Sequence, residues 1–105
     1  STDVLVCAKG GGGLIAERLQ LAAALRNAGI RAETVPANAP SLTEQYSYAA
    51  QRAARFLVIL DDALLAAGKR VRVKSMNKGG REIDVSREEV VVRLRGMLAD
   101  GRRRV

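Results

Sequence analysis

Three basic side chains alternate with two valines in one short segment of the chain. Successive side chains of an extended strand point to opposite faces, so Arg70, Arg72 and Lys74 would share one face at intervals of about 6–7 Å. That interval is similar to the spacing of successive phosphates, and a planar guanidinium group suits phosphate oxygens. Lys78 and Arg81 follow in and after the next turn. The pattern favours a phosphate-binding surface, and the alternative is an edge strand whose charges prevent aggregation.

Four consecutive glycines occupy positions 10–13, between an apolar run and a helical pattern. A G-x-G-x-x-A pattern begins at Gly11, and Glu33 follows about 20 residues later, which is the outline of a dinucleotide fingerprint. Glycines in such a loop let backbone amides approach a pyrophosphate. However, Glu33 falls inside the next expected strand rather than at its end. The alternative is a flexible loop at the sheet edge that contacts an RNA phosphate with help from Lys9.

Catalytic chemistry has little support in this composition. The chain has no histidine, the commonest general base near neutral pH, and its single cysteine cannot complete a Cys/His zinc site. Cys7 lies inside an apolar run, where a cysteine is usually an inert core residue. Asp61 and Asp62 form a carboxylate pair that would suit a metal or acid–base role, and the alternative is a solvated turn. We expect no catalytic residue, metal or cofactor.

Charge is distributed unevenly along the chain. Lys and Arg total 18, Asp and Glu total 11, and the formal net charge is +7. Residues 1–68 contain six of each sign, so residues 69–105 carry the whole excess. A one-sided basic field attracts polyanions, because neutralised phosphates release their condensed counterions. The charge pattern favours a polyanionic partner over a surface that is merely basic.

Size and apolar content indicate one compact domain. The chain has 105 residues, 48% of them hydrophobic, which is enough for a single core. One cysteine excludes an internal disulfide and fits a reducing compartment, so we expect a cytoplasmic protein. No apolar run approaches the roughly 20 residues that span a bilayer. The first residues lack an initiator methionine and a signal-peptide pattern, and we therefore expect a piece of a longer protein.

Periodicity predicts eight elements in the order β-α-β-α-β-β-β-α. Strand–helix–strand passages favour parallel pairing, whereas the turn at residues 77–80 favours a hairpin. Capping boxes at Ser41–Glu44 and Ser86–Glu89 mark two helix starts. Gly29 and Gly101 are expected to end the first and last helices. The expected strands are 4–8, 30–35, 56–60, 70–76 and 82–85, and the expected helices are 14–28, 42–54 and 90–100. The prediction is an α/β fold with three α/β/α layers and a mixed five-stranded sheet.

Three segments resemble the anticodon-binding domain of class II aminoacyl-tRNA synthetases, most closely the histidyl branch. They are residues 3–7, 25–33 and 55–60. The resemblance extends from about Asp3 to Leu98 and implies a sheet with one strand antiparallel to the rest. It suggests an anticodon-binding-like domain at residues 1–101 followed by a basic tail at 102–105.

Two longer motifs, residues 3–14 and 40–49, resemble the histidyl-synthetase-like region of general-control kinases, especially plant and algal forms. Those kinases phosphorylate the alpha subunit of translation initiation factor two when amino acids run out. The resemblance implies a noncatalytic regulatory domain that binds uncharged tRNA, within a serine/threonine protein kinase. Ribosomal components and a second copy of the parent protein are further partners that it suggests.

Departures from the synthetase pattern lie at the start of the second helix. Histidyl synthetases tend to carry lysines there, whereas this chain has Thr43, Glu44 and Ser47. The difference disfavours specific reading of a histidine anticodon and suits general sensing of uncharged tRNA. Matching positions of the family's anticodon face suggest five RNA-binding residues, namely Ser41, Gln45, Tyr48, Arg72 and Lys74. Tyr46 and Tyr48 are candidates for stacking on bases.

Three other functions remain open from the sequence. The chain would suit the anticodon-binding domain of a working histidyl-tRNA synthetase. It would also suit a dimerisation or ribosome-docking module without RNA binding. A small nucleotide-binding domain built on the glycine run is the third.

Overall fold

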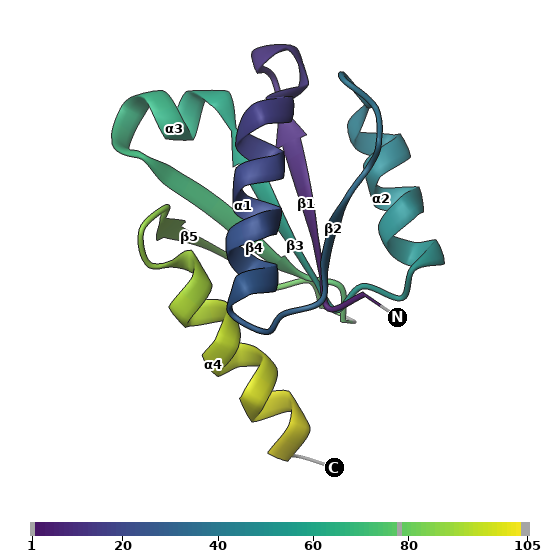
Figure 1. Cartoon of the computed structure of the whole chain (residues 1–105), viewed down its shortest axis with the longest axis vertical. Coiled ribbons are helices and arrows are strands. Elements are labelled where there is room, and N and C mark those ends of the chain that lie inside the picture. The colour runs from purple at the N-terminus through teal and green to yellow at the C-terminus, as the bar shows by residue number, and fades with distance from the viewer. Residues whose placement is uncertain (1, 78, 104–105) are drawn as a thin grey trace.

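The computed structural model describes residues 2–77 and 79–103, with side chains through residue 100. In chain order its elements are β1 (Val4–Lys9), a 3-10 turn (Gly11–Gly13), α1 (Ile15–Asn27), β2 (Ala32–Thr34), α2 (Leu42–Gln51), β3 (Phe56–Asp61), α3 (Asp62–Gly68), β4 (Arg70–Ser75), β5 (Glu82–Ser86) and α4 (Val90–Arg103) (Figure 1). Within this described part, no helix has the length and apolar character needed to cross a membrane.

The five strands form one mixed sheet in the order β2-β1-β3-β4-β5. Strands β2, β1 and β3 are parallel, and β4 is antiparallel to both of its neighbours. The expected mixed sheet with one reversed strand is therefore confirmed. Because β4 lies between β3 and β5, the edge-strand interpretation of its charges is wrong, and β5 forms that edge of the sheet.

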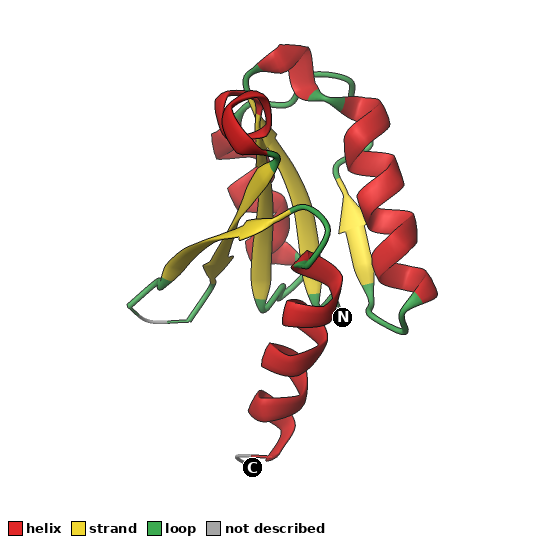
Figure 2. Ribbon diagram, turned by 90° about the vertical axis from the view of Figure 1, so that its left-hand side faces the viewer, coloured by secondary structure: helices red, strands yellow, loops and turns green. Residues whose placement is uncertain are grey.

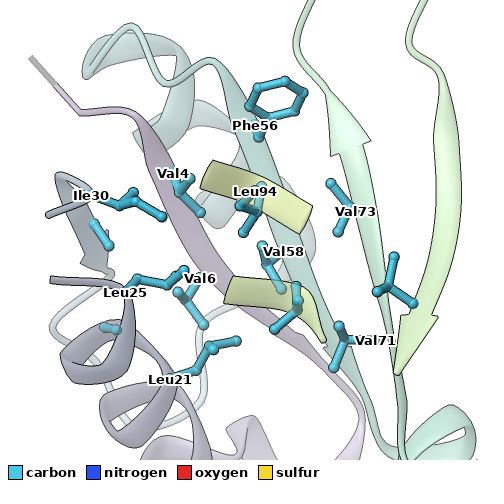
Figure 3. Packing of buried hydrophobic residues seen from close by; sticks show 14 of the residues in the cluster. Val4, Val6, Leu21, Leu25, Ile30, Phe56, Val58, Val71, Val73 and Leu94 are labelled. Atoms are coloured by element: carbon cyan, nitrogen blue, oxygen red, sulfur yellow. The ribbon is translucent and has the colours of Figure 1, made fainter. Parts of the chain in front are cut away.

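Helices cover both faces of the sheet (Figure 2). On one face, valines of β1, β3 and β4 pack against Leu21 and Leu25 of α1 and Leu94 of α4 (Figure 3). On the other face, Leu5, Cys7, Leu57 and Ile59 pack toward α2 through Ala49. Fully burying one such leucine contributes about 1.5–3 kcal/mol. The two clusters give the three expected layers and fix which side of each strand remains available for binding.

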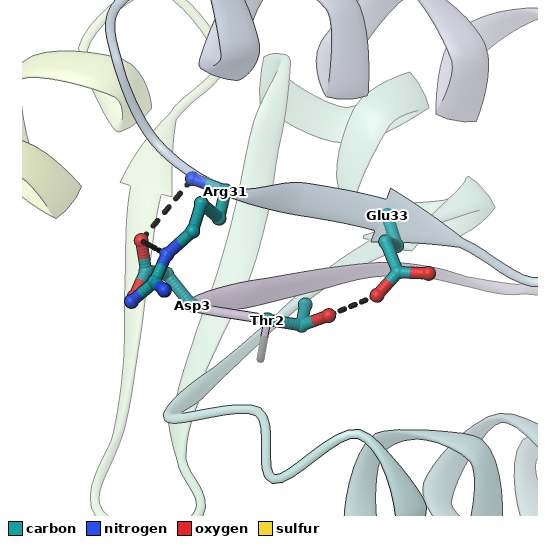
Figure 4. Close-up of polar contacts among 4 residues, drawn as sticks. All are labelled: Thr2, Asp3, Arg31 and Glu33. Atoms are coloured by element: carbon teal, nitrogen blue, oxygen red, sulfur yellow. Dashed lines mark hydrogen bonds and ion pairs between the residues drawn. The ribbon is translucent and has the colours of Figure 1, made fainter.

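The short edge strand β2 is held by side chains at its start (Figure 4). The buried Asp3 carboxylate accepts bonds from the backbone amide and the guanidinium of Arg31, each at 3.1 Å. Thr2 donates its hydroxyl hydrogen to Glu33. These contacts position β2 beside β1 although β2 has only three residues.

Several element boundaries differ from the expected ones. Helix α3 was not expected, because its seven residues are too few to show a helical period. Helix α2 ends three residues early, since Ala53 has a left-handed φ of 53°. Helix α4 continues through Gly101 to Arg103, so the expected stop at Gly101 is wrong. A glycine ends a helix only where it leaves the helical conformation.

Candidate nucleic-acid interface

Four of the predicted RNA-binding residues share the sheet face on which α2 lies. Val71 and Val73 of β4 are buried under α1 and α4, so alternation sends Arg70, Arg72 and Lys74 to the opposite face. Lys9 is exposed at the end of β1 and lies in a groove of about 170 Å³. The groove lies between α2 and the hairpin and is lined by Lys9, Leu42, Tyr46, Ile59, Asp61, Arg72 and Glu82. We call Lys9, Arg70, Arg72 and Lys74 the basic face.

Carboxylates of β5 pair with two residues of the basic face. Asp84 lies opposite Arg72 and accepts two bonds from its guanidinium, at 2.9 and 3.4 Å. Glu82 lies opposite Lys74, with Nζ and Oε1 3.7 Å apart. The hydrogen bond from Arg72 lowers the pKa of Asp84, so this carboxylate stays charged. The predicted positive stripe is therefore partly neutralised, and RNA must compete with these acids for it.

Removing the two carboxylates is expected to strengthen RNA binding. An E82Q/D84N variant frees Arg72 and Lys74, so its affinity for uncharged tRNA should rise about threefold to tenfold. Fluorescence titration measures the change, with E17Q/D100N as the control, because it makes the same charge change on exposed residues of α1 and α4. Equal gains from both variants would show that only net charge matters.

Tyr46 lines the same groove. The sequence suggested only that its ring could stack on bases and did not indicate this position. Its half-buried ring lies 5.2 Å from the Nζ of Lys74 and lines the groove beside Arg72. Tyr48 is on the other flank of α2, where its hydroxyl donates to Glu33 at 3.3 Å and accepts from Arg52 at 2.9 Å. Tyr46 is therefore placed beside the basic face, and Tyr48 is placed toward β2.

Ser41 and Gln45 position α2 by different means. Ser41 is exposed and forms the expected capping box, with its hydroxyl accepting from the Glu44 amide at 3.1 Å. Gln45 is fully buried, accepts from the Ala8 amide at 2.8 Å and donates to the Ala8 carbonyl at 2.9 Å. A side chain in this state cannot reach RNA while the domain is folded. The expected RNA contact of Gln45 is thus corrected to a structural bond between α2 and β1.

Arg81 lies on the opposite face of the sheet from Arg72. It lines a groove of about 390 Å³ together with Arg55 and Arg93, above apolar residues that include Ile83. We call this the arginine groove. Lys78 lies outside the described residues. The predicted RNA-binding residues therefore do not form one surface. Alternation along β4 could not predict this, because it gives no information on which face the residues after the turn occupy.

The dinucleotide fingerprint is not assembled. Glu33 pairs in register with Leu5, so it lies roughly 15 Å along β1 from the glycine run. The glycine run packs beside Asp62, since a Cβ on Gly11 would stand 3.2 Å from the Asp62 Cγ. This carboxylate disfavours a bound pyrophosphate. The arrangement speaks against the nucleotide-binding alternative.

The two candidate carboxylates lie where β3 ends at Asp61 and α3 begins at Asp62. Asp61 caps α3, accepting from the amides of Ala63 at 2.9 Å and Leu64 at 3.3 Å. No group of three or more potential metal-ligating acids, cysteines or histidines occurs within residues 2–77 and 79–103. The segment that the alternative interpretation treated as a solvated turn is the capped start of α3.

Cys7 is a core residue of β1. Burial raises the pKa of its thiol to about 12. Because the thiolate is the reactive form, we expect no labelling of the native protein by a disulfide reagent at mildly alkaline pH. Denaturant should make the thiol react at once. Rapid labelling of the folded protein would show that β1 opens or that Cys7 is activated.

Comparisons with known proteins agree with this geometry. The family model described as "Anticodon binding domain" matches residues 3–97. The eIF-2-alpha kinase GCN2 of Arabidopsis thaliana is 43% identical over 93 residues, which are 89% of this chain and 7% of that protein. The chain thus spans a small fraction of the curated relative that it matches.

Solved structures with the same fold include two histidyl-tRNA synthetases. The apo enzyme of S. aureus gives a TM-score of 0.76 at 20% identity, covering 90% of this chain and 23% of that one. The enzyme of Nostoc sp. PCC 7120 gives a TM-score of 0.75 at 22% identity, covering 91% of this chain and 21% of that one. Since the family model spans nearly the whole domain and the fold agrees, the chain belongs to the anticodon binding domain family.

Proposed function

We propose that this chain is the noncatalytic tRNA-binding domain of a cytoplasmic, starvation-sensing protein kinase, and that uncharged tRNA is its ligand. The observation that carries the proposal is 43% identity to the kinase GCN2 over most of the chain, within an anticodon binding domain. Histidyl-tRNA synthetases share only the fold with this chain, at 20–22% sequence identity. A synthetase function therefore has weaker support than the kinase-domain function.

The basic face supplies the physical basis for RNA binding. Lys9 and Arg72 line one groove with Tyr46, which offers cations for phosphates beside a ring that can contact a base. Recognition by such a surface rests on phosphate position and RNA shape more than on base identity. That chemistry suits a sensor of many uncharged tRNAs rather than a reader of one anticodon.

Regulation of the parent kinase would follow from linkage. A ligand shifts a conformational equilibrium only by the difference in its affinity for the two states. In the proposed protein, tRNA therefore binds this domain more tightly when the kinase is in its active arrangement. The phosphates must also displace Glu82 and Asp84 from their cations, which keeps the affinity moderate.

The test is a titration of the domain with uncharged tRNA over a series of salt concentrations. The proposal predicts that the logarithm of the binding constant falls linearly with the logarithm of salt, by about 0.7–0.9 for each phosphate contact. Binding that is absent even at low salt would overturn RNA recognition by this domain. Salt-insensitive self-association or ribosome binding would then favour a dimerisation or docking module.

A further inference from the structure

Arg18 is a buried cation that the proposed function has not used. It lies on α1, its side chain is fully buried, and it is among the largest fully buried side chains of the described residues. Its guanidinium donates five hydrogen bonds to neutral acceptors in the glycine turn, at the end of β2 and in the loop that follows β2. They are Nε to the Gly13 carbonyl (2.6 Å), Nη1 to the Thr34 hydroxyl (3.0 Å) and the Val35 carbonyl (2.9 Å), and Nη2 to the carbonyls of Ala37 (2.6 Å) and Asn38 (3.1 Å).

The charge of Arg18 is not balanced by an ion pair with any described carboxylate. Burial lowers the pKa of the guanidinium, because loss of contact with water disfavours its charged form. Burying a cation is unfavourable unless its donors are well satisfied. Here the Thr34 hydroxyl of β2 and the carbonyls of two different loops satisfy them, so the residue has the geometry of a clamp between those loops.

Gly13 brings the same two loops into direct contact. A Cβ at this position would lie 1.9 Å from the Asn38 carbonyl oxygen and 2.8 Å from the Ala39 Cα, and the φ of Gly13 is +100°. Only glycine permits this approach. The turn Gly11–Gly13 and the loop 36–40 lie at the same end of the molecule (Figure 1). We call these two segments the clamped loops.

The clamped loops flank the groove beside the basic face. One begins two residues after Lys9, and the other leads directly into Ser41 at the start of α2. Gln45 continues the connection, because it donates to the Ser41 carbonyl at 3.2 Å while it holds Ala8. The clamp and Gln45 together therefore fix the position of the start of α2 relative to Lys9.

We propose that Arg18 is a positioning residue for RNA binding, holding the clamped loops so that Lys9 and the start of α2 are preorganised for the RNA backbone. The proposal rests on the proposed function. Arg18 itself contacts no phosphate, because its side chain is buried and its donors are occupied. Loss of the clamp lowers the fraction of molecules in the binding arrangement, and the apparent affinity falls by that fraction.

The experiment compares wild type, R18K and R18M by amide hydrogen exchange and by tRNA titration over a salt series, at a temperature where all are folded. R18M should speed exchange of the amides at 11–13 and 37–39. If the freed loops occupy the binding arrangement about a tenth of the time, its Kd rises about tenfold with an unchanged salt slope. R18K keeps the charge without the guanidinium fork and should recover only part of the affinity.

A glycine pair covers the case in which R18M does not fold. G13A drives a Cβ into Asn38 and should weaken tRNA binding, whereas G29A, also at positive φ but beyond the other end of α1, meets nothing within 4 Å and should bind as wild type. Loosened loops with wild-type affinity would overturn the positioning role. A salt slope reduced by about one contact would show that Arg18 touches RNA directly. If wild type binds no tRNA, the proposed function fails, and exchange alone decides whether the clamp exists.

Discussion

An R70A/R72A/K74A variant should bind uncharged tRNA about a hundredfold more weakly than wild type at about 0.1 M salt. Each lost phosphate contact removes about 0.7–0.9 from the slope of log K against log salt, so the slope should fall by about two. The side chains of all three residues lie on one face of β4, and their loss leaves Val71 and Val73 in the core. The measurement is a salt series of fluorescence titrations.

The matched control for this variant is R81A/R93A/R95A. It removes the same charge from exposed residues on the side of the sheet where α4 packs. The control should retain most of the affinity and the slope. If both triple variants lose affinity equally, the protein binds RNA through its overall charge, and the basic face has no special role.

Gln45→Ala should destabilise the domain by about 3 kcal/mol, because it leaves the buried amide and carbonyl of Ala8 without partners, each worth about 1–3 kcal/mol. Chemical denaturation measures the loss. The tRNA affinity of the folded fraction should change little, since Gln45 is not at the surface.

Gln51→Ala is the control, since Gln51 is the exposed last residue of the same helix. It should leave stability nearly unchanged. The opposite pattern, normal stability of Q45A with weakened tRNA binding, would restore Gln45 as a direct RNA contact.

Local sequence signals predicted the parts of the fold that depend on neighbouring residues. The Ser41–Glu44 capping box forms, and the alternation along β4 separates Val71 from Arg72. Glycine 29 adopts a left-handed φ of 84° beyond α1, as a helix stop requires. These features need only a few adjacent side chains and backbone angles, so the sequence contains the information directly.

Features that depend on distant partners were not predictable from the pattern. The sequence pattern along α1 gives no sign that Arg18 is buried, and only acceptors in the glycine turn and in the segment after β2 explain its burial. Glu82 and Asp84 neutralise β4 because the hairpin register sets them opposite Lys74 and Arg72. Their period-two spacing after the turn was the signal that could have indicated this pairing.

The most direct test of the account is to titrate uncharged tRNA into the isotopically labelled domain at low salt and map the perturbed backbone amides by NMR. The account predicts that the largest changes lie at Lys9, at the start of α2 from Ser41 to Tyr46, and along β4 from Arg70 to Lys74. Changes confined to the arginine groove at Arg55, Arg81 and Arg93 would contradict the assigned surface. A spectrum without changes would contradict tRNA binding itself.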